Sequence, residues 1–176
     1  MIADAAKAAV LLFLAVVVQA TIMGSIQIFG GTPDLVLVLL LVCALLRGSV
    51  FGAIGGFWAG FLLDTVYLGT LGVTSLLLTL AGYWIGRYGE TTGRDRAHAP
   101  FVSVAVVTVL FAVGELALHF LLGEPVETRA ALVDSMPGTL LLNLLLTVPV
   151  YALVRRLLIP AWRDTGTHSA EVPIVG

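Results

Sequence analysis

Long apolar stretches alternate with short polar segments along the chain. A hydrocarbon core of about 30 Å needs roughly 20 apolar residues per crossing helix. Six stretches are apolar and long enough to be interpreted as crossings, so the pattern predicts an all-α integral membrane protein. The predicted helices are Ala5–Met23, Pro33–Leu46, Val50–Leu68, Val73–Ile85, Phe101–Leu122 and Pro137–Ile159.

Positive charges lie in alternate gaps between these stretches. Of the nine Lys and Arg residues, only Arg129 lies in the opposite set of gaps. Because Lys and Arg near short loops are retained in the cytoplasm, the asymmetry predicts six transmembrane helices with both chain ends inside. The residues of the cytoplasmic set are Lys7, Arg47, Arg87, Arg94, Arg96, Arg155, Arg156 and Arg163.

Composition narrows the function classes. Hydrophobic residues make up 59% of the chain and charged residues 11%, whereas soluble domains run nearer about half and about a quarter. We therefore predict one membrane domain over residues 1–159 and a short, disordered cytoplasmic tail over residues 160–176. The net charge of −2 and the dispersed basic residues argue against nucleic acid as a partner. The single cysteine, Cys43, lies inside an apolar run and is interpreted as a packing residue.

Two helix ends carry recognisable signals. Thr32 is predicted to be the N-cap of the second helix, with Pro33 at its first position and Asp34 in its first turn. The fourth helix is predicted to end in an aromatic interfacial anchor, followed by a solvated loop over Arg87–Pro100. The first helix could instead be a signal peptide cleaved after Val18-Gln19-Ala20.

Five polar residues are predicted to lie in the half of the membrane away from the cytoplasm. A rise of about 1.5 Å per residue places two of the acids roughly 20 Å from the turn at Arg47, along consecutive antiparallel helices. Ionisable groups inside a membrane usually face the bundle or a watery cavity. We therefore predict a partner or ligand site composed of Asp34, Asp64, Glu115, His119 and Asn143.

Each member of this set also has a structural interpretation. Asp34 suits the positive end of its helix, and Asn143 can link helices. Glu115 and His119, one turn apart, can form a hydrogen-bonded pair or a proton relay. Asp64 lies near a helix C-terminus, where an acid opposes the helix dipole. We expect hydrogen bonds to hold it there, so that it organises that end of the bundle.

Glycine recurs every fourth residue along the third predicted helix, directly after the cytoplasmic turn at Arg47. Such spacing lets another helix approach closely. The stripe suits packing within the bundle, and the sharper hypothesis is a seam for a partner's transmembrane helix. Its members are Gly48, Gly52, Gly56 and Gly60.

No catalytic arrangement stands out in the sequence. We find no glycine-rich phosphate loop, no metal-ligand spacing and no nucleophile with a paired base. We therefore expect a protein that is not an enzyme and that needs neither a metal nor a cofactor.

Several short motifs in one order resemble the MreD family of bacterial rod shape-determining membrane proteins. They span the third of the chain from Pro33 to Arg87. The motifs are Pro33-Asp34-Leu35, Arg47-Gly48, Gly52-Ala53-Ile54-Gly55-Gly56-Phe57, Gly60, Asp64, Leu71-Gly72 and Gly82-Tyr83.

The resemblance implies a non-catalytic scaffold of the elongasome, the assembly that inserts peptidoglycan along rod-shaped cells, in the bacterial inner membrane. It implies MreC as the direct partner and, through it, MreB, RodA and a class B penicillin-binding protein, with membrane lipid around the bundle. It also implies a fold similar to the substrate-binding subunits of energy-coupling-factor vitamin transporters. Two other functions stay open: a vitamin-binding subunit, and a proton-coupled transporter that uses Glu115 and His119.

Overall fold

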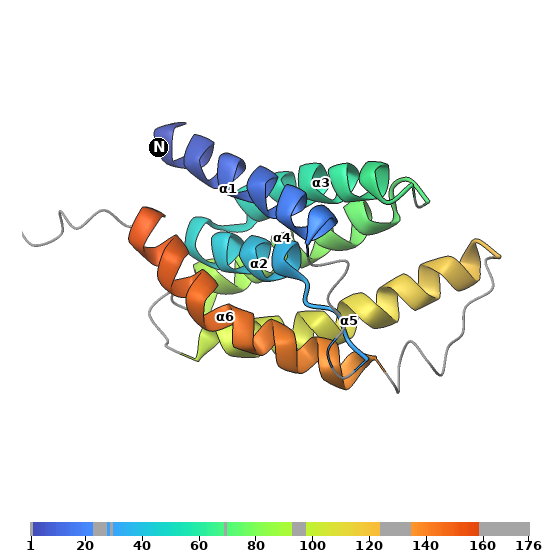
Figure 1. The fold of residues 1–176 in the computed structure, drawn as a ribbon. Helices are drawn as coiled ribbons and strands as arrows, with labels where there is room; N and C mark the ends of the chain where they lie inside the picture. Colours follow the sequence, from blue (N-terminus) through green and yellow to red (C-terminus); the bar gives the residue numbers. More distant parts are fainter. Residues whose placement is uncertain are drawn as a thin grey trace, which may run out of the picture.

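The computed structural model describes residues 2–22, 28, 30–68, 70–92, 98–123 and 135–158. Within these ranges the chain forms six α-helices (Figure 1). They are α1 (Ile2–Thr21), α2 (Leu35–Arg47), α3 (Ser49–Val66), α4 (Val73–Thr92), α5 (Ala99–Leu121) and α6 (Met136–Leu158). The all-helical class is therefore confirmed for the described residues, and each helix other than α4 begins and ends within about three residues of the prediction.

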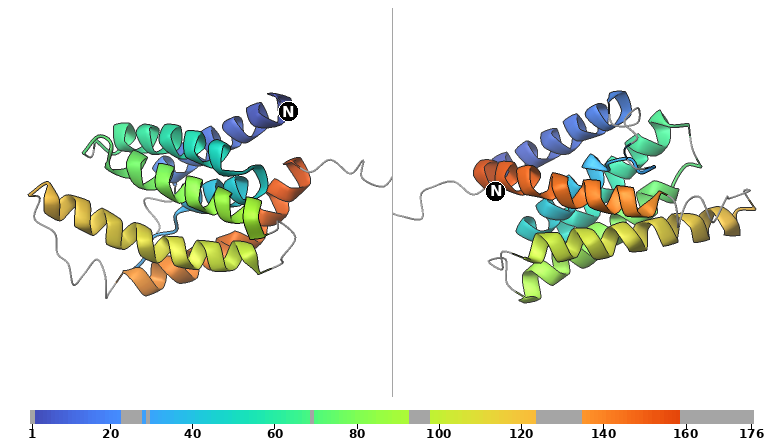
Figure 2. Two further views of the ribbon diagram at one scale, coloured as in Figure 1. Left: turned by 180° about the vertical axis from the view of Figure 1, so that it is seen from behind. Right: turned by 60° about the horizontal axis from the view of Figure 1, so that its bottom comes forward.

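The centre of the bundle is α2, which packs against all five other helices. These surround it in the order α1, α3, α4, α5, α6, and α6 returns to α1 (Figures 1 and 2). Eleven of the 13 residues of α2, Val36 to Leu46, are buried. A helix that is apolar on every side is stable only when other elements surround it. The Leu- and Val-rich sequence of α2 therefore fixes its central place.

Successive helices run in opposite directions between two ends of the bundle. We call them the Asp34 end, where α2 begins, and the Arg47 end, where it finishes. The start of α1 and the finish of α6 both lie at the Arg47 end (Figure 1). This arrangement is the one expected for a chain with both ends on one side of a membrane.

The outside of the bundle is strongly apolar. More than half of the surface of Trp58, Trp84, Leu110 and Leu145 is exposed, which suits a hydrocarbon environment better than water. Among the described helices, α3, α5 and α6 are long and apolar enough to cross a membrane. The apolar part of α1 and the whole of α2 are shorter. The membrane class is thus supported, and the count of six crossings stays a prediction.

The closest helix pair is α3 and α4, which meet through glycine. A Cβ atom added to Gly52 would overlap the backbone of Gly82, and one added to Gly82 would overlap Gly52 in return. At Gly56 an added Cβ would overlap the backbone of Leu78, and at Gly60 that of Ser75. Backbones that touch in this way need residues without side chains. The stripe is therefore occupied by α4 inside the same chain, in place of the partner seam that we hypothesised for it.

The stripe begins at Gly48, which joins α2 to α3. Its φ of 101° lies in the left-handed region that glycine adopts readily. Its backbone also lies against Gly86, where a Cβ would overlap it. Gly48 thus serves the turn and the contact with α4 together.

Two predicted helix ends are wrong. The N-cap of α2 is Asp34, whose side chain accepts a hydrogen bond from the N–H of Leu37 at 2.9 Å, and not Thr32. Helix α4 continues to Thr92, well past the predicted end at Ile85, so the first part of the predicted loop is helical. Gly89 explains the extension, because it packs on the backbone of Leu45 and holds the last turns of α4 against α2.

Other predictions fall outside the described residues. They concern Arg129, which lies within residues 124–134, the middle of the cytoplasmic loop over residues 93–97 and the tail over residues 160–176.

Candidate functional site: a polar cavity at the Asp34 end

Asp34 stands where three helices meet. Its carboxylate caps α2, and its own N–H donates to Oδ1 of Asn143 on α6 at 2.8 Å. An Asp in this position satisfies N–H groups that the first turn of a helix leaves unpaired. The cap therefore fixes the carboxylate at the start of the central helix.

Asn143 is completely buried and links α2, α5 and α6. Besides accepting from Asp34, its Nδ2 donates to Oγ1 of Thr108 on α5 at 3.1 Å. One turn later, the hydroxyl of Thr147 donates to the carbonyl of Asn143 at 2.7 Å. Buried amides are stable only with such partners, so Asn143 holds the three helices in one arrangement.

Gln19 ties the end of α1 to the same place, a role that the sequence analysis missed. Its Oε1 accepts from the N–H of Leu35 at 2.8 Å, and its Nε2 donates to the carbonyl of Pro33 at 3.2 Å. The hydroxyl of Tyr67, just after α3, donates to the carbonyl of Gln19 at 3.2 Å. The signal available in the sequence is a single glutamine inside an apolar helix, which indicates a polar contact within the bundle. The sequence analysis used Gln19 only as part of a candidate cleavage site. The structure includes α1 in the bundle.

These contacts surround a cavity of about 510 Å³, which we call the polar cavity. Four of the five predicted polar residues line it, and Asp64 does not. Side chains from α1, α2, α5 and α6 contribute, together with the segment before α2. The lining residues are Gln19, Gly30, Thr32, Asp34, Leu37, Thr108, Phe111, Ala112, Glu115, Leu116, His119, Ser135, Met136, Thr139 and Asn143.

The wall formed by α5 carries Glu115 and His119. Glu115 is exposed and His119 is partly buried, and the two interact electrostatically across one helical turn. Asp34 and Asp64 are also within electrostatic reach of Glu115. The buried residues of α5 all come from its first half, Ala99 to Thr108. Its second half contributes Phe111, Ala112, Glu115, Leu116 and His119 to the lining of the cavity.

Asp64 is placed outside the cavity and is only 4% exposed. Its carboxylate accepts from the backbone N–H groups of Gly72, Thr74 and Ser75, at 2.8, 3.3 and 3.3 Å. These are the N–H groups at the start of α4, so an acid at the end of α3 caps the next helix. The expectation that Asp64 is held by hydrogen bonds at this end of the bundle agrees with these contacts.

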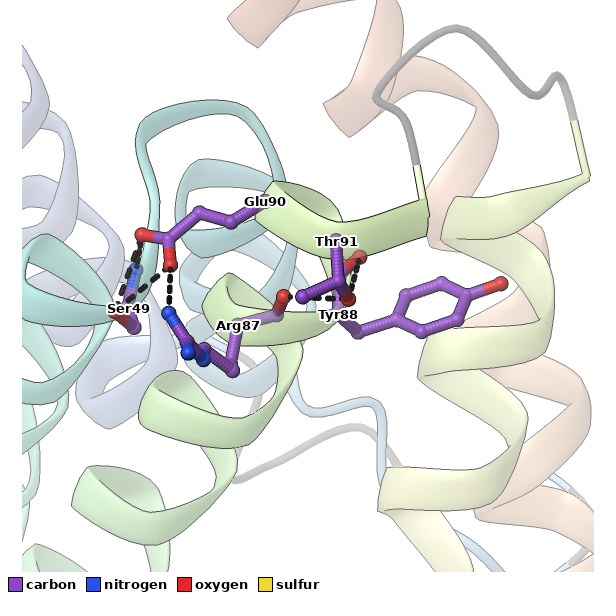
Figure 3. A network of polar contacts seen from close by, with 5 residues as sticks. All are labelled: Ser49, Arg87, Tyr88, Glu90 and Thr91. Atoms are coloured by element: carbon purple, nitrogen blue, oxygen red, sulfur yellow. Dashed lines mark hydrogen bonds and ion pairs between the residues drawn. The ribbon is translucent and has the colours of Figure 1, made fainter.

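A second cluster of polar side chains lies at the Arg47 end, beyond the apolar part of α4 (Figure 3). Glu90 accepts from the backbone N–H of Ser49 at 2.8 Å and from its hydroxyl at 3.1 Å, and pairs with Arg87 at 3.4 Å. The N–H of Ser49 stabilises the charged carboxylate and lowers the pKa of Glu90. Glu90 therefore holds the end of α4 on the start of α3. Sequence analysis missed it, since its partner is 41 residues away.

The chemistry of the cavity is that of binding. Two carboxylates, one imidazole and several amides and hydroxyls can orient a bound molecule by hydrogen bonds and charge. Among the described residues no group of three or more His, Cys, Asp or Glu side chains could hold a metal ion.

A helical bundle with an apolar exterior and polar groups gathered inside one end defines the class: an α-helical membrane protein. Within that class, the chain belongs to the MreD family, because the family model described as rod shape-determining protein MreD matches residues 6–159. No curated protein and no solved structure matches the chain. The resemblance noted over Pro33 to Arg87 is therefore confirmed and extends over nearly all of the described bundle. The similarity to vitamin-transporter subunits stays a prediction.

Proposed function

We propose that this chain is a non-catalytic scaffold of the elongasome in the bacterial inner membrane, and that it acts by binding MreC. The observation that carries the proposal is the family match over residues 6–159. The rigid α3–α4 pair and the apolar exterior suit a protein that presents fixed surfaces to other membrane proteins. Through MreC the scaffold would act on MreB, RodA and a class B penicillin-binding protein, and so on lateral peptidoglycan synthesis.

We also propose six crossings with both chain ends in the cytoplasm. The alternating helix directions support this topology, as do the basic residues at the Arg47 end. The polar cavity then opens toward the outer side. Cysteine labelling from outside is expected to reach positions 124–129 and to miss positions 94–98, and the reverse pattern would exclude this topology.

Co-purification in mild detergent tests the scaffold directly. Recovery of a single-span protein with a large outer coiled-coil domain is the expected result. Gly55→Ala serves as a folded control, because a Cβ at this position meets only the mobile side-chain ends of Leu12 and Leu40. Recovery of a transporter ATPase pair in place of the single-span protein would refute the scaffold.

The polar cavity favours a second candidate, a substrate-binding subunit of a vitamin transporter. Its volume of about 510 Å³ is large enough for a small molecule. A vitamin retained through purification, together with a transporter ATPase pair, would establish it. The third candidate, a proton-coupled transporter, has support only from the placement of Glu115 and His119 in one cavity. Proton-dependent uptake into proteoliposomes, abolished in the Glu115→Gln variant, would establish this candidate.

A further inference from the structure

We propose that the polar cavity binds an amphipathic amine, that is, a protonated ammonium group carried on a small apolar body. This inference goes beyond the scaffold role and does not depend on it. Its basis is the volume of the cavity, the sign of its charges and the presence of both polar and apolar side chains in its lining.

Hydrogen bonds within the protein fix the side chains that bound the cavity. Asn143 and Gln19 bond to Asp34, Thr108, Pro33 and Leu35. Sites for small molecules are usually preformed in this way, with volumes of about 300–1,000 Å³. At about 510 Å³ the polar cavity falls inside that range.

The charges favour a cation. Among the described residues that line the cavity, Asp34 and Glu115 are acids, His119 is a potential cation, and none is Lys or Arg. Carboxylates that face one space repel one another, and a bound cation relieves the repulsion where an anion would increase it.

The rest of the lining selects an organic cation over a metal ion. Leu37, Phe111, Leu116 and Met136 form apolar surface that an inorganic ion would leave unused. The described residues also lack a cluster of three metal-ligating side chains. An ammonium group beside Glu115 with an apolar body against Phe111 would contact both the polar and the apolar side chains of the lining.

Such an ammonium group has two possible sources at a membrane surface. One is the ethanolamine headgroup of a phospholipid, and the other is a water-soluble amine. Both present an ammonium group to Glu115, so the first experiment tests the preference for that charge and the second separates the sources.

In the first experiment, the full chain in detergent at neutral pH is titrated with benzylammonium, benzyl alcohol and benzoate. Binding is measured by isothermal titration calorimetry. These probes share one apolar body and differ in charge. We expect benzylammonium to bind about tenfold more tightly than benzyl alcohol, since one close ion pair in a sheltered site contributes about that factor. Benzoate is expected to bind most weakly. Equal binding of the three probes, or no benzylammonium binding at millimolar concentration, would overturn the proposal.

Two variants and a matched control locate the effect. Glu115→Gln is expected to lower benzylammonium affinity by about tenfold and to leave benzyl alcohol within about twofold. Asp34→Asn, which retains a good N-cap, is a second test that does not rely on the fold of the first variant. Glu90→Gln makes the same chemical change at the Arg47 end and is expected to alter neither affinity. An equal loss in Glu115→Gln and Glu90→Gln would contradict the assignment.

The second experiment uses native mass spectrometry of protein from membranes with phosphatidylethanolamine and phosphatidylglycerol. Phosphatidylethanolamine that is retained by the unchanged chain and lost from Glu115→Gln identifies the lipid as the source. Benzylammonium binding without retained phosphatidylethanolamine identifies a water-soluble amine. If the unchanged chain retained phosphatidylglycerol in preference, and Glu115→Gln lost it, the proposal would be refuted. Recovery of MreC is expected to be unchanged in Glu115→Gln, so failure of this inference can be told from failure of the scaffold.

Discussion

The helices of the α3–α4 pair and those of the α5–α6 pair are held together by different kinds of contact. In the first pair, glycines bring two backbones into direct contact from Gly48 to Gly60, and the ends are held by Asp64 and Glu90. In the second pair, Asn143 donates to Thr108 near the middle of α5, and closer to the Asp34 end both helices contribute side chains to the polar cavity. The first region is built for rigidity, and the second leaves a polar cavity.

One acid from each region shows the same contrast. Asp64 is buried and accepts from three backbone N–H groups, so its charge is used within the fold. Glu115 is exposed and lines the cavity together with His119 and Asp34. A buried, satisfied acid stabilises a structure, whereas an acid left facing a cavity is available to something that enters it.

The largest expected effect comes from filling the glycine contact. Gly56→Leu inserts a side chain where a Cβ alone would overlap the backbone of Leu78. We expect loss of the folded monomer, seen as loss of the monodisperse peak on size exclusion in detergent. A folded monomer that no longer recovers MreC would instead restore the partner seam.

A gentler pair of variants sharpens this result. Gly56→Ala is expected to lower the free energy of unfolding by about 1–3 kcal/mol, as overpacked sites do. Its neighbour Gly55 has side-chain ends rather than backbone near an added Cβ. Gly55→Ala is therefore expected to change stability by less than about 1 kcal/mol in either direction. Equal loss in both variants would show that the stripe is not special.

Removing the cap at Asp64 is expected to have the next largest effect. Asp64→Leu leaves the N–H groups of Gly72, Thr74 and Ser75 without their acceptor. We expect the free energy of unfolding, measured by thermal denaturation, to fall by about 3 kcal/mol. We also expect the variant not to restore rod shape in a complementation assay at normal expression. Asp64→Asn retains an acceptor and is expected to lose about 1 kcal/mol and to complement. Full complementation by the Leu variant would contradict the structural role.

In the second region, Asn143→Leu tests the link between α2, α5 and α6. The change leaves the N–H of Asp34 and the hydroxyl of Thr108 without a partner in a buried place. We expect the free energy of unfolding to fall by about 2 kcal/mol. Thr139→Val, at the cavity wall, is the milder control. If Asn143→Leu were as stable as the unchanged chain, the polar link would not define the cavity.

The smallest effect is expected at the exposed contact of Glu90. Its folded-state pKa is lowered from the ordinary 4.5, so its contribution is present above that value and lost as the pH falls through the folded pKa. Glu90→Gln is thus expected to melt slightly lower than the unchanged chain at neutral pH and equally at a pH well below 4.5. A difference that grows on acidification would have the wrong sign.

Sequence patterns predicted the helices because apolar length and turn residues are local properties. They also grouped Asp34, Glu115, His119 and Asn143, which line one cavity, because depth in a membrane follows from counting along a helix. They could not show which helix the stripe at Gly52 faces, because all sides of α3 are apolar.

Most of the misses share one cause, which is a partner far away in the chain. The N-cap at Asp34 is the exception, because its bond to Leu37 is local and was available in the sequence. The extension of α4 depends on contacts of Gly89 with Leu45 and of Glu90 with Ser49, which lies 41 residues away. Gln19 shows its role only once Leu35 is beside it. Tertiary contacts of this kind override local propensity and leave no periodic signal in the sequence.

The shortness of the central helix has a consequence for the membrane itself. With 13 residues, α2 measures about 20 Å, some 10 Å less than a typical hydrocarbon core. Its neighbours α5 and α6, with 23 residues each, are long enough to reach across. In the proposed topology, with the Arg47 end at the cytoplasmic surface, residues 30–34 before α2 would lie below the opposite lipid surface. Non-helical backbone at that depth is tolerated only inside protein or beside water. The start of the central helix would then form the floor of the polar cavity, at a depth set by the difference in length between α2 and the helices around it.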